Sequence, residues 1–314
     1  MIPKYSVIIP TYNREALLKK CLASLAEQRI PKDSYEVIVI NDGSRDDTEA
    51  AVNEFRIHYP ELHLVYLSQK NKGVAMARNR GIRQAQGEIV FFTDDDCVVP
   101  PDWLQALAEG YRRHPEVAGV GGWYEYPEEF YKKSIFVNYQ MLLFYKQGKI
   151  GKSEEVKSSH FFKNPAGNTS NMSYRKSVLE KLGGFDEKIN FTGLVDWELK
   201  KRISNVGHPL LYIPLYVLHL RPLGVWEVTM RFFNLGRGAY HLVIKNPEIA
   251  AFYCPSLLKY LSRARKISRG DLSTPYRVFQ KNIWALRLMN LCEFLFAKAG
   301  WEYQHWFNKF TKEI

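Results

Sequence analysis

The chain has 314 residues and a formal net charge of +11, with 46% hydrophobic and 25% charged residues. This balance is typical of a globular protein and excludes an intrinsically disordered chain. The four cysteines lie far apart without a CxxC pair, which argues against a zinc site or a disulfide framework and favours a reducing, cytoplasmic compartment. The first apolar run, 6–9, is too short for a secretory signal peptide.

Strands and helices are expected to alternate from the start of the chain. Runs rich in β-branched and aromatic residues predict strands at 5–10, 35–41, 62–67 and 89–93. Apolar residues at helical spacing predict helices within 16–25, 46–55 and 73–85. The continuous apolar character of the strands favours burial on both faces of a parallel sheet. The fold class predicted is therefore α/β, with a doubly wound, mostly parallel sheet flanked by helices.

Polar clusters follow the predicted strands, where doubly wound sheets bind their ligands. They are Thr11 to Arg14, Asn41 to Ser44, Ser68 to Gly73 and Asp94 to Asp96. Three adjacent aspartates repel one another and need a counter-charge, most simply a hard divalent cation held through oxygens. The alternative is an acidic turn before a helix that begins near Asp102.

Phosphate-binding glycine motifs are missing from the predicted turns. The first crossover lacks GxGxxG, which argues against a dinucleotide-binding dehydrogenase, and no GxxxxGK[ST] occurs. A phosphorylated ligand would then be held by a cation and by basic side chains, for which Lys72, Arg78 and Arg80 are available beside an Asn-Lys-Gly turn.

Six segments in order resemble family 2 glycosyltransferases of the GT-A fold. They are SVIIPTYNR, VINDGSRDDT, NKGVAMARNRGI, GEIVFFTDDDCVVPPDW, NTSNMSYRKSVLEKLGGFDE and VDWELKKRI. The resemblance runs from about Tyr5 to His219. It implies transfer of a sugar from a nucleotide-diphosphate donor to an acceptor, with inversion at the anomeric carbon.

The resemblance assigns roles to the polar clusters. Pro10, Thr11, Asn13 and Arg14 would line the nucleotide pocket, and Lys72 and Arg78 would approach the diphosphate. Asp42 would accept a hydrogen bond from the base, which favours UDP or dTDP; an Asx turn is its structural alternative. Asp94 and Asp95 would bind the donor through ribose or water, and Asp96 with His219 would ligate Mg²⁺ or Mn²⁺. The family often has an acid where this chain has Thr93, so the assignment within the cluster is open by one residue.

Inverting transfer also needs a general base, for which the resemblance implies Asp196. The family loop ends in an acidic pair, whose first member is replaced here by Val195. The structural alternative makes Asp196 the N-cap of a helix through Arg202, with Glu198 as the substitute base. The small-residue stretch 164–172 would lie beneath the acceptor.

The last third of the chain is basic and aromatic. Residues 221–314 contain 15 Lys and Arg against 6 Asp and Glu, nine of the eleven net positive charges. We expect 1–220 to form the nucleotide-sugar-binding and catalytic domain and 221–314 a helical extension. Arg263, Arg265, Lys266 and Arg269 would attach it to the anionic inner face of the cell membrane. The partners expected are a nucleotide-sugar donor and a glycan or lipid-linked acceptor, without nucleic acid, since no such binding module is present.

The apolar segment 203–220 contains two prolines and is expected to form two short buried strands. Three functions remain open from the sequence: an inverting glycosyltransferase in polysaccharide or cell-envelope synthesis, an inactive relative that binds a partner, and a sugar nucleotidylyltransferase.

Overall fold

The computed structural model describes residues 3–146, 153–157, 167–189, 194–222, 224–245, 247 and 283–310. The chain forms two compact units. The first comprises Met1–Glu125, Gly148–Asn190 and Asp196–Arg221, and the second Tyr126–Gln147, Phe191–Val195 and Pro222–Ile314.

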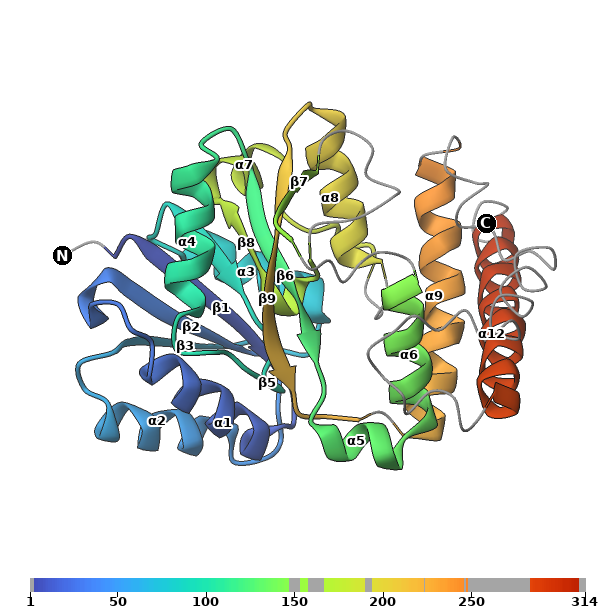
Figure 1. Cartoon of the computed structure of the whole chain (residues 1–314), viewed down its shortest axis with the longest axis horizontal. Helices are drawn as coiled ribbons and strands as arrows, with labels where there is room; N and C mark the ends of the chain where they lie inside the picture. The colour runs from blue at the N-terminus through green and yellow to red at the C-terminus, as the bar shows by residue number, and fades with distance from the viewer. Residues whose placement is uncertain are drawn as a thin grey trace. The chain divides into compact units, whose positions relative to one another are not determined.

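The first unit is built on a mixed nine-stranded sheet in the order β3-β2-β1-β4-β8-β6-β9-β5, with β7 paired to β9 (Figure 1). The pairings β1 with β2, β1 with β4, β2 with β3 and β6 with β9 are parallel, and the other pairings are antiparallel. The predicted doubly wound α/β fold is therefore confirmed. Beyond β4 the sheet continues through β8, β6, β9 and β5, with both parallel and antiparallel pairings. The strands are β1 Tyr5–Thr11, β2 Tyr35–Asn41, β3 His63–Ser68, β4 Ile89–Phe92, β5 Cys97–Val98, β6 Gly119–Glu125, β7 Glu155–Lys157, β8 Met172–Arg175 and β9 Leu210–His219.

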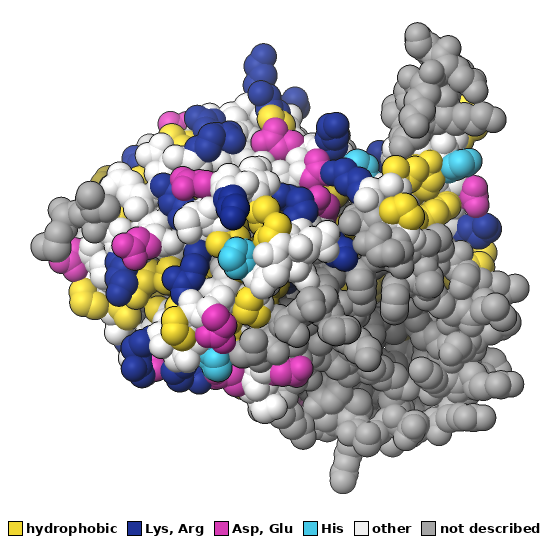
Figure 2. All heavy atoms as spheres, turned by 90° about the horizontal axis from the view of Figure 1, so that it is seen from above, with side chains coloured by type: hydrophobic (Ala, Val, Ile, Leu, Met, Phe, Trp, Pro, Cys, Tyr) yellow, Lys and Arg dark blue, Asp and Glu magenta, His cyan; other side chains and the backbone are white. Residues whose placement is uncertain are grey.

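The helices of the first unit follow the predicted alternation. They are α1 Glu15–Ala26, α2 Thr48–His58, α3 Val74–Gln84, α4 Trp103–Arg113, α7 Lys176–Lys181 and α8 Val195–Asn205. Two 3₁₀ turns, Lys32–Ser34 and Thr169–Asn171, precede β2 and β8. On the face seen in Figure 2, Lys and Arg side chains are interspersed with Asp and Glu over the described part of the surface.

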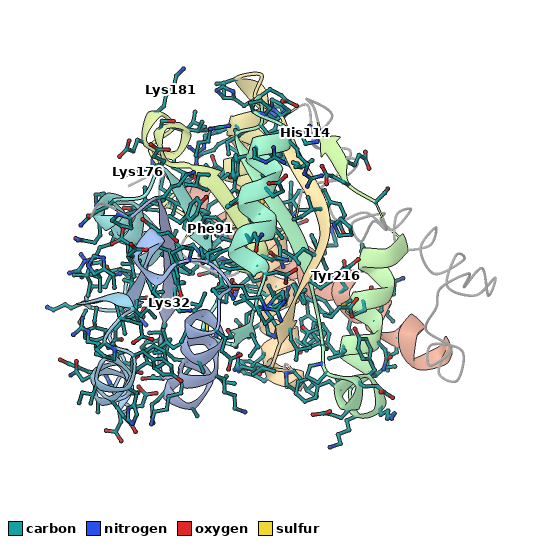
Figure 3. All side chains as sticks on the ribbon, turned by 60° about the vertical axis from the view of Figure 1, so that its left-hand side comes forward. Lys32, Phe91, His114, Lys176, Lys181 and Tyr216 are labelled. Atoms are coloured by element: carbon teal, nitrogen blue, oxygen red, sulfur yellow. The ribbon has the colours of Figure 1, made fainter. Side chains whose placement is uncertain are left out.

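The core lies on both faces of the sheet, because successive side chains of a strand point to opposite sides. Phe91 meets the ring of Trp103 in α4 at 5.6 Å, whereas its neighbour Phe92 meets Phe185, beyond α7, at 5.4 Å. Both β4 phenylalanines are fully buried. Figure 3 shows Phe91 inside the unit, with Lys176 and Lys181 at its outside. The sheet edge where β4 ends is thus fixed by packing from both sides.

One prediction about the sheet is wrong. The segment expected to form two short strands contains the end of α8 and one ten-residue strand, β9. The strand continues through Pro214 because its pairing with β6 shifts register there, from Gly121 opposite Tyr212 to Trp123 opposite Tyr216. A proline lacks the N–H that a ladder needs, and an irregularity accommodates it without ending the strand.

The second unit is helical, with α5 Glu128–Lys133, α6 Ile135–Lys146, α9 Val225–Lys245 and α12 Ile283–Phe310. Helices α9 and α12 approach closely at two glycines. A side chain at Gly236 would overlap the carbonyl of Ala297, and one at Gly300 that of Phe233. Within the described residues, no helix has the length and apolar character that a bilayer span requires. The basic cluster at 263–269 lies outside the described residues.

Candidate functional site

The loops that follow β1 and β2 are joined by hydrogen bonds. Asn13 has a left-handed backbone, with φ 51°, which asparagine tolerates better than most residues. Its amide donates to Ser44 Oγ at 2.9 Å, and its Oδ1 accepts from the amide of Arg45 at 2.7 Å. Two of the predicted polar clusters therefore form one surface at the carboxyl ends of the strands.

Asp42 organises the third cluster. Its buried carboxylate accepts hydrogen bonds from Gln69 Nε2 at 2.8 Å and from the amides of Lys72 and Gly73, both at 2.9 Å. These three donors belong to the loop that follows β3. Asp42 therefore contacts a neighbouring loop, which the alternative, an Asx turn within its own loop, does not account for. Three donors leave accepting capacity on the two oxygens, since a carboxylate has about four lone-pair sites. The side chain of Lys72 is exposed, so it is free to reach solvent or a ligand.

Two arginines pair with the three aspartates, so one negative charge of the cluster is left uncompensated by them. Arg14 Nη1 contacts Asp95 Oδ1 at 2.8 Å and Asp96 Oδ2 at 3.1 Å, and Arg78 Nη2 contacts Asp94 Oδ1 at 2.8 Å. The sequence argument placed a divalent cation here as the simplest counter-charge, whereas the protein supplies a guanidinium to each carboxylate. These contacts also bring the β1, α3 and β4 clusters together, as the predicted sheet requires.

Burial sets the protonation behaviour of this cluster. It raises the pKa of Asp95 and of Asp96 above the ordinary value of a carboxyl. Arg14 opposes the shift in both residues, and the charge of Asp94 adds to it at Asp96. The charged cluster is therefore costly without a cation in addition to the arginines.

Asp96 and His219 form the donor set that a metal would need. His219 Nε2 lies 3.4 Å from Asp96 Oδ1, while Asp96 Oδ2 faces Arg14. Strand register places the histidine, because Cys97 pairs with His219 in the β5–β9 ladder. Cys97 Sγ lies 3.8 Å from Asp96 Oδ1, and burial raises the pKa of this thiol well above its usual range. A carboxylate beside an imidazole fits Mn²⁺ or Mg²⁺, whereas a thiolate suits softer metals.

The Gly-Gly-Phe turn after α7 connects the aspartates to α8. The Arg78 guanidinium stacks on the Phe185 ring at 5.5 Å, and Asn79 bonds the Phe185 backbone, accepting from its amide and donating to its carbonyl. Arg202 of α8 donates to the carbonyls of Leu182 and Gly184 at 2.5 and 2.6 Å. Helix α8 is thus anchored to the turn that Arg78 covers.

Asp196 lies in the first turn of α8 and is partly exposed. Helix α8 begins at Val195, so Asp196 lies inside the first turn; its Oδ1 accepts from the amide of Trp197 at 3.0 Å. The preceding Leu194 has a left-handed backbone, with φ 61°, which is costly for a leucine. Glu198, by contrast, is buried and bonds Arg202 through both oxygens at 2.8 to 3.0 Å. The proposed substitute base is therefore held in a structural ion pair.

Three residues near the site were missed by the sequence argument. Gln69 donates to Asp42. Tyr174 and Lys200 are fully buried, and the charge of Asp196 acts on both. Gln69 lies within the predicted Ser68 to Gly73 cluster but was given no role there. Lys200 lies four residues after Asp196 in a predicted helix, which is the signal that could have found it.

Comparisons with known proteins agree with this architecture. The model of glycosyl transferase family 2 matches residues 6–183. Glycosyltransferase AglE of Haloferax volcanii is 32% identical over 243 residues, covering 76% of this chain and 73% of the relative. The probable glycosyltransferase YdaM of Bacillus subtilis is 28% identical over 250 residues, 78% of this chain and 57% of that protein.

Solved structures share the fold. The mannosyltransferase PcManGT of Pyrobaculum calidifontis, in complex with GDP-Man and Mn²⁺, has a TM-score of 0.68 at 21% identity, covering 96% of this chain and 88% of that one. Staphylococcus aureus TarS 1–349 in complex with UDP has a TM-score of 0.59 at 18% identity, covering 95% and 90%. The family model over more than half of the chain, the archaeal relative and the shared GT-A fold make this protein a member of glycosyl transferase family 2.

Proposed function

We propose that the protein transfers a sugar from a UDP or dTDP donor to a hydroxyl acceptor with inversion at the anomeric carbon. The observation that supports this most is the set of carboxylates Asp42 and Asp94 to Asp96, whose partners join the loops at the carboxyl ends of the first strands. The partly exposed Asp196 lies in the first turn of α8. Arg78 pairs with Asp94, and Tyr174 experiences both Arg78 and Asp196, so the acidic cluster and Asp196 belong to one electrostatic environment.

The nucleotide would lie over the loops after β1, β2 and β3. The remaining lone pairs of Asp42 suit the N3–H of uracil or thymine, and the joined Asn13–Ser44 surface would flank the nucleoside. Pro10 and Thr11 are buried beneath this surface, which makes them supports for the pocket. Lys72, which is exposed, and Arg78 would approach the diphosphate, and Arg78 also pairs with Asp94 and covers the Phe185 ring. Arg14, which pairs with Asp95 and Asp96, would line the nucleotide pocket.

Asp96 and His219 would hold Mg²⁺ or Mn²⁺. Asp96 Oδ1 faces the imidazole, and Asp96 Oδ2 faces Arg14. Oδ1 would therefore bind a cation while Oδ2 keeps its pair with Arg14. When bound, the cation would offset negative charge on the departing diphosphate. Asp94 and Asp95 would bind the donor directly or through water.

Asp196 would act as the general base. Its carboxylate would take the proton of the acceptor hydroxyl as that oxygen bonds to the anomeric carbon and the bond from this carbon to the diphosphate oxygen breaks. Partial exposure leaves the carboxylate accessible to an acceptor, which the buried and paired Glu198 is not.

A panel of nucleotide sugars tests the proposed function. Purified protein is incubated with UDP-, dTDP- and GDP-sugars, simple alkyl glycosides and Mn²⁺. Metal-dependent release of UDP or dTDP, with a product of inverted anomeric configuration by NMR, is expected. Release of pyrophosphate would instead identify a nucleotidylyltransferase, and the absence of turnover with any donor would favour a binding protein.

We also propose a glycan or lipid-linked acceptor and attachment to an anionic membrane surface through Arg263, Arg265, Lys266 and Arg269. The supporting observation is the concentration of nine of the eleven net charges after residue 220, together with Trp226 and Trp306, which are 73% and 60% exposed. Each basic residue near such a surface contributes about 1 kcal/mol.

Sedimentation with vesicles tests this attachment. The protein should pellet with phosphatidylglycerol vesicles at low salt and stay in the supernatant at high salt. The variant with glutamine at all four basic positions should lose this binding. Equal recovery with neutral and anionic vesicles at low salt would refute the attachment.

A further inference from the structure

Lys200 is a lysine enclosed in the protein interior. It lies in α8, its side chain is 0% exposed, and its Nζ donates to the carbonyl of Gly167 at 2.6 Å. Within the part of the chain that the structure describes, this carbonyl is its hydrogen-bond partner. An ammonium has three donors and is strongly hydrated in water, so this environment is costly for it.

The opposite charge near Lys200 comes from Asp196. The two residues are four apart in one helix, a spacing that puts side chains on the same face. Burial lowers the pKa of Lys200 to about 8, and the Asp196 carboxylate opposes that shift. Asp196 acts on the fully buried phenol of Tyr174 in β8 as well, and this phenol also experiences Arg78 of α3 and Tyr111 of α4.

The carbonyl that anchors Lys200 is rigidly held. Gly167 has φ +69°, and a side chain there would overlap the carbonyl of Gly122 in β6. The amide of Asn168 donates to the same Gly122 carbonyl at 3.2 Å. Asn171 then ties β6 to β9 by donating to the carbonyls of Trp123 and Leu215, both at 2.8 Å. The anchor therefore belongs to the part of the sheet that ends at His219.

A lysine in this position has a cost that an apolar side chain would avoid. Packed apolar residues in place of buried charges are often neutral or stabilising. Departures of this kind from the most stable choice concentrate at functional sites. Through its bond to Gly167, Lys200 connects α8 to the part of the sheet that ends at His219. The proposed reaction needs both in place, because α8 carries Asp196 and His219 would hold the metal.

We propose that Lys200 is a positioning residue for Asp196, because it ties α8, the helix that carries Asp196, to the Gly167 carbonyl and places a positive charge on the same face of that helix. This inference rests on the proposed function, in which Asp196 is the general base. Lys200 does not touch the reacting atoms and acts through Asp196.

A double-mutant cycle tests the coupling between the two charges without a substrate. Thermal unfolding is measured for the full chain with Asp196→Asn, Lys200→Met and both changes. Removing the carboxylate leaves Lys200 without its counter-charge, so Asp196→Asn should lower the Tm by roughly 2–4 °C in the native background. In the Lys200→Met background it should lower the Tm by less, because only the attraction to the helix N-terminus is then lost. Additive shifts would overturn the proposal, because a lysine that only bonds Gly167 has no coupling to Asp196.

Turnover then separates positioning from structure. With the donor found by the panel, Lys200→Met should lower kcat about tenfold, with unchanged affinity for UDP and Mn²⁺. The double variant should be no slower than Asp196→Asn alone. Lys201→Met, the same change at the next residue of α8, is the matched control and should keep the native kcat.

The outcomes for the two proposals differ. A native kcat in Lys200→Met, while Asp196→Asn is inactive, would overturn the role of Lys200 and leave the base assignment standing. Native turnover in Asp196→Asn would overturn the base assignment, and the role of Lys200 with it.

Discussion

Exchanging one oxygen of Asp196 for an amide, as Asp196→Asn, should separate catalysis from folding. Loss of a general base lowers turnover by about 10²–10⁴-fold, which corresponds to about 3–5 kcal/mol in the activation barrier. The fold should change little, because asparagine keeps the oxygen that accepts from the Trp197 amide at 3.0 Å. The stability lost is the attraction of the charge to the helix N-terminus and to Lys200, about 1 kcal/mol.

Glu198→Gln on the same helix is the matched control, and the structure predicts that it lowers stability and leaves turnover nearly unchanged. Both Glu198 oxygens bond the Arg202 guanidinium, and the glutamate side chain is 5% exposed. Losing this charge weakens the anchor between α8 and the turn at Leu182 and Gly184, for an expected loss of about 1–3 kcal/mol in the free energy of unfolding. Turnover per folded molecule should stay near the native rate.

The assay pairs steady-state nucleotide release with chemical denaturation, at a temperature where both variants are folded. UDP affinity should be native in each variant, since the proposed role of Asp196 is towards the acceptor and Glu198 is held by Arg202. The reasoning is refuted if Asp196→Asn keeps turnover within tenfold of native, or if Glu198→Gln loses as much activity as Asp196→Asn while folded.

Three further outcomes are expected. Asp96→Asn should weaken Mn²⁺-dependent UDP binding at least tenfold by calorimetric titration; unchanged affinity would move the metal role elsewhere. Because burial raises the pKa of Asp95 and Asp96, the folded metal-free protein binds protons that the unfolded chain does not. Its Tm should therefore rise as the pH falls from 7 towards 5, and the same rise in the variant with both residues changed to asparagine would contradict this origin. Gly236→Ala should cost about 1–3 kcal/mol of stability, because the added methyl overlaps the Ala297 carbonyl, whereas Gly224→Ala has room and should not; equal stability of the two variants would contradict the close approach of α9 and α12.

The arrangement of the first sheet half was determined by local sequence. Buried strands bounded by polar turns and helices at a regular interval specify a parallel sheet, and parallel strands end at the same edge. That is why four clusters identified separately, among them the residues around Asn13 and Asp42, come into hydrogen-bond contact. β2 has the predicted bounds, β1 and β4 differ from the prediction by one residue at one end, and β3 is shifted by one residue at both ends.

The tertiary structure alone decided how the charges pair and where the second half of the sheet runs. Arg14 reaches Asp95 and Asp96 across about eighty residues, and His219 faces Asp96 because β9 pairs with β5. Periodicity reports which face of an element is buried but not which distant side chain meets it there. For the same reason the burial of Lys200 against Gly167, and the hydrogen bond from Arg202 to the Gly184 carbonyl, follow from packing between elements. Local patterns specified the elements and the edge of the sheet, and long-range contacts determined which carboxylates at that edge stay available for chemistry.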